Sequence, residues 1–286
     1  MKTYRPAWVR PVNALPVIVL VLLVTHPGRA FGQDFKEELV TVQAGDIPII
    51  LSAPHGGRLA IPKVDKRLGV GVRSFRTVMD TRTDLLTQKI ADEIEKETGK
   101  RPFLVIAQFH RRYVDANRKP ERAFESPNAK PVYEAYHQAI RDAKAQVIKH
   151  WGFGLLLDVH GQAAEPKAII RGTQNGKTVK HLLARFGDRA LIGESSLFGE
   201  FSKQGIDVIP KVDSKAKEDD RYDGGFIVQT YGSGMGGTLD AIQLELGGEL
   251  RSRDRIDQTA KELASSIVTF ANAYLKLNRP ELLNSR

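Results

Sequence analysis

The 286-residue sequence contains no cysteine, which excludes a fold held together by disulfide bonds. Small secreted domains commonly need disulfides because their hydrophobic cores are too small to stabilise them alone. This chain is long enough to bury one sizeable core. The missing cysteines therefore argue against a small disulfide-stapled extracellular module and favour a protein with an ordinary core.

Long apolar runs are also missing. No stretch after residue 32 approaches the ~20 apolar residues that a membrane span needs. The first 32 residues have a basic start, an apolar run over 14–24 and small residues before a cleavage point after Gly32. That layout is typical of a secretory signal peptide; the alternative is an uncleaved N-terminal anchor. We predict a signal peptide over 1–32, a single domain over 33–286, export to the periplasm or the extracellular space, and no stable membrane insertion after cleavage.

A strong basic stripe is the third absence. The formal net charge is +9, and removal of residues 1–32 with their four basic and no acidic residues leaves +5. No basic helix or aromatic-interleaved patch is present, so we predict no nucleic-acid partner. The modest positive balance fits an anionic substrate or cell-wall material without requiring one.

The remaining sequence alternates between strand-like and helix-like segments. The run over 153–159 is almost continuously apolar, as in a central strand buried on both faces. We find no internal repeat and no domain boundary, so the alternation predicts a single α/β domain. The last expected helix starts at Asp254, which could cap it. The expected strands cover 37–42, 47–53, 103–107, 153–159, 168–170, 207–209, 226–230 and 241–246, and the expected helices cover 84–98, 132–150, 178–186, 195–204 and 254–277.

Two histidines follow or end apolar strands. His55 precedes Gly56 and Gly57, which permit a positive φ or a close backbone approach. Asp158 and His160 are two residues apart on a strand, so their side chains share one face. Open α/β sheets carry their active sites at the carboxyl edge, where both imidazoles could meet a metal and Asp158 could orient one of them. An exposed turn histidine and a structural Asp–His hydrogen bond are the alternatives.

Two aspartates flank the start of the expected helix over 84–98. Asp80 precedes it, and Asp84 lies in its first turn. The helix dipole alone favours carboxylates at both positions. Together with His55 and His160, one of them would complete a set of three protein ligands that leaves a fourth zinc position open.

Two further groups could carry chemistry. Gln243 and Glu245 share one face of an otherwise apolar strand, where a carboxylate is costly unless it is used or paired. Glu245 could act as a general base or form an ion pair with Arg251. The segment Arg111–Arg118 holds three arginines with an aspartate and an asparagine, and it could grip a carboxylate or form a salt-bridged surface loop.

In this order, these motifs resemble the N-formylglutamate amidohydrolase family, which is similar to zinc carboxypeptidases in fold. The motifs are Ser52-Ala-Pro-His55-Gly-Gly, Asp80-x-x-x-Asp84, Arg111 through Asp115-Ala-Asn117-Arg118, Asp158-Val-His160-Gly and Gln243-Leu-Glu245. They span most of the chain after the signal peptide. The resemblance implies a mixed, mostly parallel central sheet flanked by helices, and one Zn²⁺ held by two histidines and an acidic residue.

The resemblance also implies roles for individual residues. The metal ligands would be His55, Asp80 and His160, the general base Glu245, and the substrate-binding residues Arg111, Asn117 and Arg118. Asp80 is favoured over its rival Asp84 because its spacing to Thr83 resembles a ligand motif of related phage poly-γ-glutamate hydrolases. Carboxypeptidases usually have a glutamate three residues after the first histidine, where this chain has Arg58, so the acidic ligand must come from farther along.

The leading hypothesis is an exported zinc-dependent hydrolase that cleaves an amide bond of an acidic N-acyl amino acid, a γ-glutamyl peptide or a wall fragment. Zinc would lower the pKa of a water molecule to about 7, and Glu245 would accept its proton. Export does not suit N-formylglutamate itself, which arises in cytoplasmic histidine catabolism. The alternatives are a metallocarboxypeptidase acting on peptide C-termini and a non-catalytic envelope protein that binds acidic ligands.

Overall fold

The computed structural model describes Met1, residues 38–72 and residues 74–277. The predicted signal peptide lies outside the described residues, apart from Met1. Within the described part, no helix has both the length and the apolar character that a membrane crossing requires.

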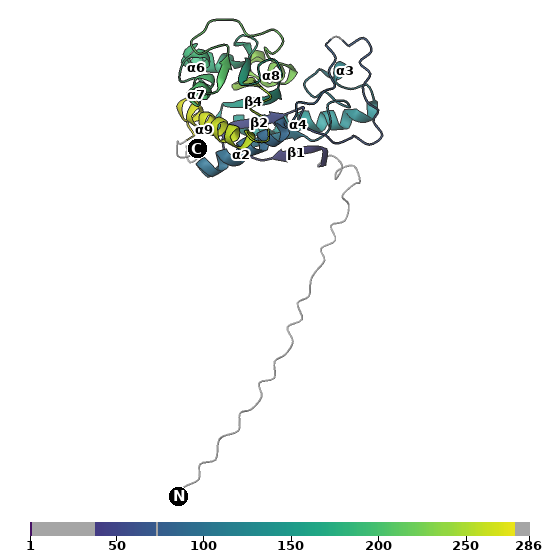
Figure 1. Cartoon of the computed structure of the whole chain (residues 1–286), viewed down its shortest axis with the longest axis horizontal. Coiled ribbons are helices and arrows are strands. Elements are labelled where there is room, and N and C mark those ends of the chain that lie inside the picture. The colour runs from purple at the N-terminus through teal and green to yellow at the C-terminus, as the bar shows by residue number, and fades with distance from the viewer. Residues whose placement is uncertain (2–37, 73, 278–286) are drawn as a thin grey trace.

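A seven-stranded sheet forms the centre of the described chain, in the order β1-β3-β2-β4-β7-β5-β6 (Figure 1). The neighbours β3, β2, β4 and β7 are parallel, whereas β1 is antiparallel to β3 and β5 is antiparallel to β7. The predicted mixed, mostly parallel sheet is therefore confirmed. The strands are β1 (Val40–Gln43), β2 (Ile49–Ala53), β3 (Phe103–Ala107), β4 (Gly154–Gly161), β5 (Ala168–Gly172), β6 (Asp207–Ile209) and β7 (Leu239–Leu246).

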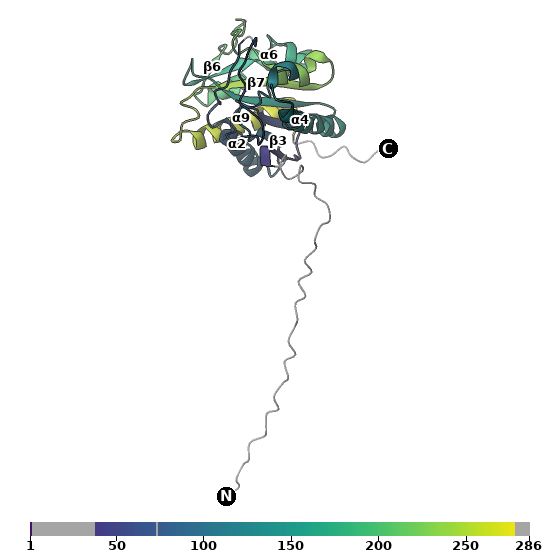
Figure 2. The same cartoon turned by 90° about the vertical axis from the view of Figure 1, so that its right-hand side faces the viewer.

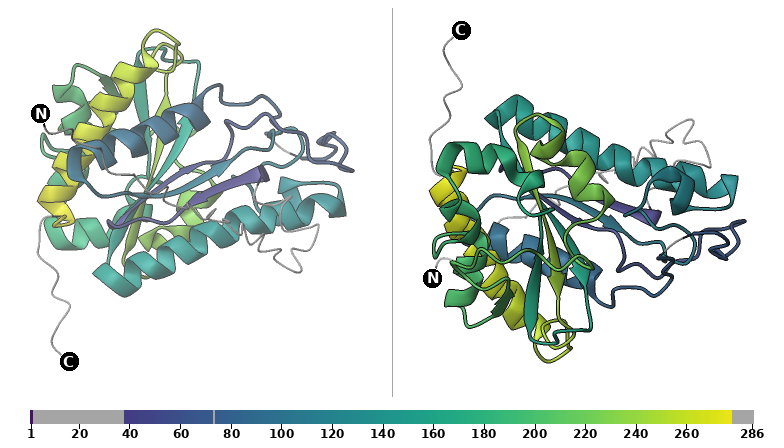
Figure 3. Two further views of the ribbon diagram at one scale, coloured as in Figure 1. Left: turned by 90° about the horizontal axis from the view of Figure 1, so that it is seen from below. Right: turned by 90° about the horizontal axis from the view of Figure 1, so that it is seen from above.

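Helices cover both faces of this sheet (Figure 3). On one face α2 and α9 pack together with α5 and α7, and on the other lie α4 and α8. The two ends of the sheet are separated in Figure 2, with β6 and α6 at one end and β3 and α2 at the other. The helices are α2 (Thr83–Thr98), α3 (Pro120–Ala123), α4 (Lys130–Trp151), α5 (Lys180–Phe186), α6 (Arg189–Ile192), α7 (Leu197–Lys203), α8 (Phe226–Tyr231) and α9 (Ile256–Tyr274).

Two sequence-based expectations about local structure are wrong. The segment expected as a strand over 226–230 is the helix α8. A short apolar run cannot distinguish a strand from a buried helix, and here the amide of Ile227 donates to the Asn117 side chain from another part of the chain. Asp254 does not cap the last helix, because α9 begins at Ile256 and Arg255 occupies the N-cap position.

The central strands become polar toward their carboxyl ends on the face that packs against α4 and α8. Along β4 the side chains on this face change from Leu156 to Asp158 and His160, while the opposite face remains apolar. Strand register places Ser52 of β2 beside Asp158, and His160 beside Glu245 of β7. The fold thus gathers polar side chains from three central strands at one edge of the sheet.

Candidate metal centre

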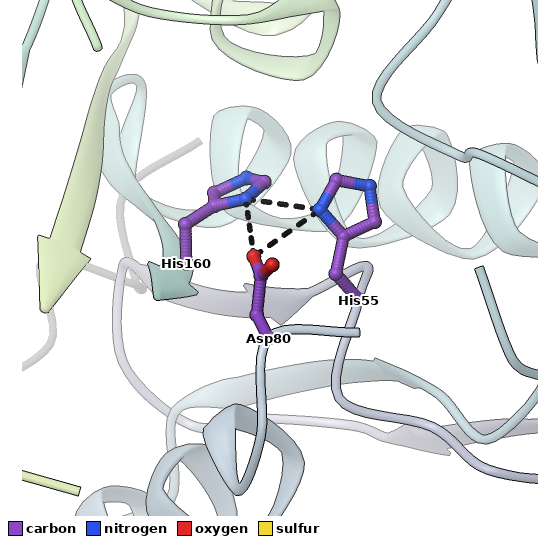
Figure 4. A group of neighbouring side chains, drawn as sticks. All are labelled: His55, Asp80 and His160. Atoms are coloured by element: carbon purple, nitrogen blue, oxygen red, sulfur yellow. Dashed lines mark hydrogen bonds and ion pairs between the residues drawn. The ribbon is translucent and has the colours of Figure 1, made fainter. Parts of the chain in front are cut away.

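Three side-chain atoms converge at this edge: Nδ1 of His55, Nδ1 of His160 and Oδ2 of Asp80 (Figure 4). The two imidazole nitrogens are 3.2 Å apart. Asp80 Oδ2 lies 3.3 Å from the His55 nitrogen and 3.2 Å from that of His160. The three atoms therefore form a nearly equilateral triangle, and the side chains that carry them are at least nine-tenths buried.

The triangle fits a tetrahedral metal ion. With zinc–ligand distances of about 2.0–2.1 Å, neighbouring ligand atoms lie about 3.3–3.4 Å apart. The observed edges of 3.2–3.3 Å match that spacing. Three protein ligands would occupy one face of the tetrahedron and leave the fourth position for water or substrate, as in catalytic rather than structural zinc sites.

His55 is oriented by a carboxylate on the side away from this triangle. Its Nε2 lies 2.7 Å from Oδ1 of Asp115. The other oxygen of Asp115 accepts two hydrogen bonds from Arg111, at 3.0 and 2.9 Å. The amide of Asn117 donates to Oδ1 as well. Asp115 is thus held on both oxygens, and it keeps the His55 proton on Nε2.

His160 is oriented in the same way by a different carboxylate. Its Nε2 lies 2.8 Å from Oδ2 of Asp158, and Oδ1 of Asp158 accepts a 2.5 Å hydrogen bond from the Ser52 hydroxyl. With the protons of both histidines on Nε2, the lone pairs of both Nδ1 atoms face Oδ2 of Asp80. Three electron pairs in mutual contact repel one another unless a cation or a proton lies between them, so the donor set itself favours a bound cation.

Asp80, rather than its rival Asp84, supplies the acidic member of this group. Asp80 Oδ2 also accepts from the amide of Gly161, directly after His160, at 3.2 Å. Asp84 does not belong to the converging group of described residues. Its backbone instead lies against Gly56, where an added Cβ would be 2.3 Å from the Asp84 nitrogen.

The two glycines after His55 are required by close packing. A Cβ on Gly57 would lie 2.3 Å from the carbonyl carbon of Gln108, just as a Cβ on Gly56 would meet Asp84. Neither glycine has a positive φ. Of the alternatives raised by the sequence, close backbone approach is therefore confirmed and the left-handed conformation is wrong. These contacts fix His55 between the end of β3 and the start of α2.

The surrounding charges act strongly on the converging groups. Burial alone would lower the pKa of His160, but the charge of Asp158 and hydrogen bonds with Asp158 and Asp80 raise it to about 10. Burial would raise the pKa of Asp80, and its hydrogen bonds with His160 and His55 instead bring it well below the ordinary range. Without a metal, a proton would therefore take the place of the cation, and metal binding must displace it.

Glu245 lies beside His160 on the neighbouring strand and is 8% exposed. Burial raises the pKa of its carboxyl to about 7, with the charge of His160 opposing the shift. Its Oε1 accepts a 3.0 Å hydrogen bond from the Gln243 amide group. A carboxylate that titrates near neutral pH and is held in one orientation is suited to accept and return a proton.

The expected substrate-binding residues are close by but are engaged within the protein. Arg111 is paired with Asp115, and its Nη1 lies 3.6 Å from Asp80. Asn117 accepts from the amide of Ile227 and donates to Gln243, so its amide group is bonded at both ends. Arg118 is half-buried and donates to the Asn117 carbonyl. Contact with a substrate would require Asn117 to exchange one of these bonds.

Arg58, Tyr231 and the Gly-rich loop over residues 232–237 also lie outside the converging group of described residues. Arg58 is exposed. Tyr231 is buried, and its hydroxyl lies 2.8 Å from Nδ1 of His137. The Gly-rich loop over 232–237 precedes the amino end of β7, at the opposite end of that strand from Glu245.

Sequence reasoning did not identify the partners of Asp158 and His55. The arginine-rich segment 111–118 contains Asp115, but Asp115 lies on a loop eight residues after β3 ends at Ala107, and no local pattern assigns it to His55. Ser52 belongs to the first motif, which assigns it no role. Its position on the same sheet face as Asp158 was a usable signal once β2 and β4 were paired.

Comparison with solved structures shows which known fold this chain adopts. No protein-family model matches the sequence, and no curated protein matches it. N-formylglutamate amidohydrolase from Ralstonia eutropha JMP134 aligns with a TM-score of 0.58 and 15% identity, over 84% of this chain and 99% of that one. The gene product Atu2144 from Agrobacterium tumefaciens aligns with a TM-score of 0.55 and 14% identity, over 84% and 97%. The chain therefore has the fold of the N-formylglutamate amidohydrolase structure, as its motifs predicted.

Proposed function

We propose that this protein is an exported zinc-dependent hydrolase that cleaves an amide bond in an acidic substrate. The observation that carries the proposal is the triangle of His55, Asp80 and His160 donor atoms with edges of 3.2–3.3 Å. The similarity in fold to an N-formylglutamate amidohydrolase agrees with amide hydrolysis. The substrate would be an N-acyl amino acid, a γ-glutamyl peptide or a wall fragment.

Zinc bound to these three residues would polarise the amide carbonyl and make water acidic enough to ionise near neutral pH. Glu245 accepts a proton from the attacking water and delivers it to the nitrogen of the leaving amine. Gln243 keeps the Glu245 carboxyl in position through its 3.0 Å hydrogen bond. Asp115 and Asp158 hold the two imidazoles so that their Nδ1 atoms stay directed at the metal.

Arg111, Asn117 and Arg118 would bind the carboxylate of the substrate. The positive charge of Arg111 is shared between Asp115 and Asp80. Burial lowers the pKa of Arg118 and the charge of Asp115 opposes that shift. A substrate carboxylate would stabilise this partly desolvated guanidinium, which would favour acidic substrates.

Metal content tests the first half of the proposal. Purified wild-type protein should contain about one zinc per chain after dialysis, and His160→Ala should contain none, because two remaining ligands bind zinc weakly. A matched control is His150→Ala, which alters a histidine near the C-terminal end of α4. Metal-free preparations of wild type and His160→Ala alike, even with added zinc, would refute the zinc site.

Turnover tests the second half. A panel of N-acyl amino acids and γ-glutamyl peptides should be assayed with added zinc. Glu245→Gln should keep the metal and lose at least ~10²-fold in kcat, the usual contribution of a general base. Unchanged turnover in Glu245→Gln would remove this residue from its role. Activity confined to the C-terminal bond of ordinary peptides would identify a carboxypeptidase instead.

A further inference from the structure

Asp80 reaches the metal centre from a segment without regular structure. Residues 54–82 connect the end of β2 to the start of α2 and contain no strand or helix in their described part. Asp80 is the member of the converging group that does not come from a strand end or the turn directly after one. Its placement to within a few tenths of an ångström therefore needs contacts that fix this segment against β4.

The side chain of Arg251 supplies contacts of this kind. Arg251 lies in the turn after β7, is 7% exposed and directs its guanidinium to three backbone carbonyls. Nε donates to Leu246 at 3.1 Å, Nη2 to Gln162 at 3.3 Å, and Nη1 to Thr81. One planar group thus joins the segment after β4, the end of β7 and the residue that directly follows Asp80.

Arg82 reciprocates the contact. Its Nη1 donates to the Arg251 carbonyl at 3.2 Å. Arg82 has φ of 64°, in the left-handed region that a residue with a side chain rarely adopts. The chain accepts this conformation at the point where it leaves Asp80 and enters α2. The two arginines therefore link residues 80–82 to the turn after β7 by hydrogen bonds in both directions.

Gly161 provides the surface on which this guanidinium rests. A Cβ at Gly161 would lie 2.5 Å from Cζ of Arg251, so the planar group covers the backbone directly after His160. The amide of the same glycine donates to Asp80. Burial lowers the pKa of Arg251, whereas the charges of Asp80 and Glu245 counteract that shift. Both acidic groups of the proposed site thus lie within electrostatic reach of Arg251.

We propose that Arg251 is a positioning residue that holds the Asp80 segment against the end of β4, and so sets the affinity of the metal centre. Among the described residues, the guanidinium of Arg251 donates to backbone carbonyls rather than to the converging atoms, so it acts through Thr81 and Gly161. The inference rests on the proposed function, since it assumes that the converging group binds a metal.

Zinc affinity is the decisive readout, measured by competition with a chromophoric chelator. Arg251→Met removes the donors and the charge and should weaken zinc binding by about 10–100-fold, as loss of an outer contact to a metal ligand commonly does. Gly161→Ala retains Arg251 but displaces its guanidinium, and it should weaken zinc binding in the same direction. Arg251→Lys should lie between Arg251→Met and wild type.

Arg185→Met is the matched control. Arg185 also donates to a backbone carbonyl, that of Tyr274, but it lies over Phe153 before the amino end of β4, away from the metal centre. Its replacement should leave zinc affinity at the wild-type value. Folded Arg251→Met and Gly161→Ala proteins that bind zinc as tightly as wild type would overturn the proposal.

Hydrogen exchange of the metal-free proteins separates this inference from the proposed function. Amides over residues 79–83 should exchange faster in Arg251→Met than in wild type, and unchanged in Arg185→Met. If wild type bound no zinc, the proposed function would fail, and this exchange measurement would still decide whether Arg251 holds the segment. Equal exchange over 79–83 in Arg251→Met and wild type would refute the positioning role.

Discussion

The two histidines of the metal centre use the same contact in two different settings. Each presents Nδ1 to Asp80 and places Nε2 on a buried carboxylate, Asp115 for His55 and Asp158 for His160. Asp115 lies on a loop and is neutralised by Arg111, whereas Asp158 lies on a central strand and accepts from the Ser52 hydroxyl. We refer to His55 with Asp115 and Arg111 as the His55 branch, and to His160 with Asp158 and Ser52 as the His160 branch.

The difference shows that a buried carboxylate can be held in place either by its position on a strand or by an ion pair with a charged partner. A strand already fixes the Asp158 side chain, so a neutral hydroxyl suffices, and the charge of Asp158 acts mainly on His160, whose pKa rises to about 10. A loop fixes its side chains less well, and Asp115 is held by an ion pair with two hydrogen bonds. The His55 branch should therefore depend on charge compensation, and the His160 branch on strand geometry.

The largest expected effect is a loss of stability in the His55 branch. Asp115→Ala leaves the buried Arg111 without its main partner and should destabilise the fold by about 3–5 kcal/mol, the range for breaking a buried ion pair. Urea unfolding followed by circular dichroism measures this. Combining it with Arg111→Met should recover part of the loss, because the uncompensated charge is then gone. A double variant no more stable than Asp115→Ala would contradict the charge explanation.

The next largest effect should be a loss of stability on acidification, through His137, which contacts the loop that carries Asp115 of the His55 branch. Nε2 of His137 donates to the carbonyl of Ala116, next to Asp115, at 3.0 Å. Burial lowers the pKa of His137 to about 4, while the hydrogen bond to Ala116 opposes the shift. Because this folded-state pKa lies below the unfolded value of about 6.5, the unfolded chain binds the extra proton first. This group's full stability is therefore present above pH ~6.5 and falls by about 3 kcal/mol as the pH approaches 4.

The measurement is the free energy of unfolding between pH 7 and 4 for wild type and His137→Gln, which cannot titrate there. Subtracting the two curves removes the contribution of other groups. The difference should favour wild type at pH 7 and shrink steadily toward pH 4. A difference that stays constant with pH would show that His137 remains neutral in both states or protonated in both.

The His160 branch should respond more in metal affinity than in stability. Asp158→Asn removes a charge whose hydrogen-bond partners among the described residues are the Ser52 hydroxyl and His160, with no arginine or lysine. It should weaken zinc binding by about 10–100-fold and destabilise the fold less than Asp115→Ala. Chelator competition measures the zinc affinity of both variants, and urea unfolding measures their free energies of unfolding. If Asp158→Asn destabilised the fold as much as Asp115→Ala, the contrast between the branches would be lost.

The smallest expected effect concerns the hydroxyl behind Asp158. Ser52→Ala removes the 2.5 Å hydrogen bond to Oδ1 of Asp158. It should lower the free energy of unfolding by no more than about 3 kcal/mol, the upper end of the range for a hydrogen bond to a charged group. Zinc affinity should fall only a few-fold, because β4 still holds Asp158 in place. A fall as large as that in Asp158→Asn would mean that Ser52, rather than the strand, positions the carboxylate.

The same contrast explains how far the sequence alone could reach. The apolar runs of β2 and β4 and the turn residues around them predicted where His55 and His160 lie, because parallel strands end at one edge. Asp80 was reached through a motif resemblance, and the structure brings it to both histidines. The link between His55 and Asp115 spans 60 residues and a loop, which no local pattern encodes.

The α8 segment and Arg251 show the remaining limit. The apolar residues of α8 suit a strand, and only contacts with Asn117 and the sheet reveal a helix. The sequence suggests Arg251 as an ion-pair partner for Glu245, but in the structure its guanidinium donates to backbone carbonyls of three segments. Backbone carbonyls carry no sequence signal, so partners of this kind become visible only in the folded chain.

The central claim is that His55, Asp80 and His160 form one metal site. Calorimetric titration of metal-free protein with zinc tests it most directly when Asp80→Ala and Asp84→Ala are compared. Wild type and Asp84→Ala should each bind one zinc per chain with similar affinity, and Asp80→Ala should bind at least ~10²-fold more weakly because a direct ligand is gone. Tight binding by Asp80→Ala, or its loss in Asp84→Ala alone, would contradict the account.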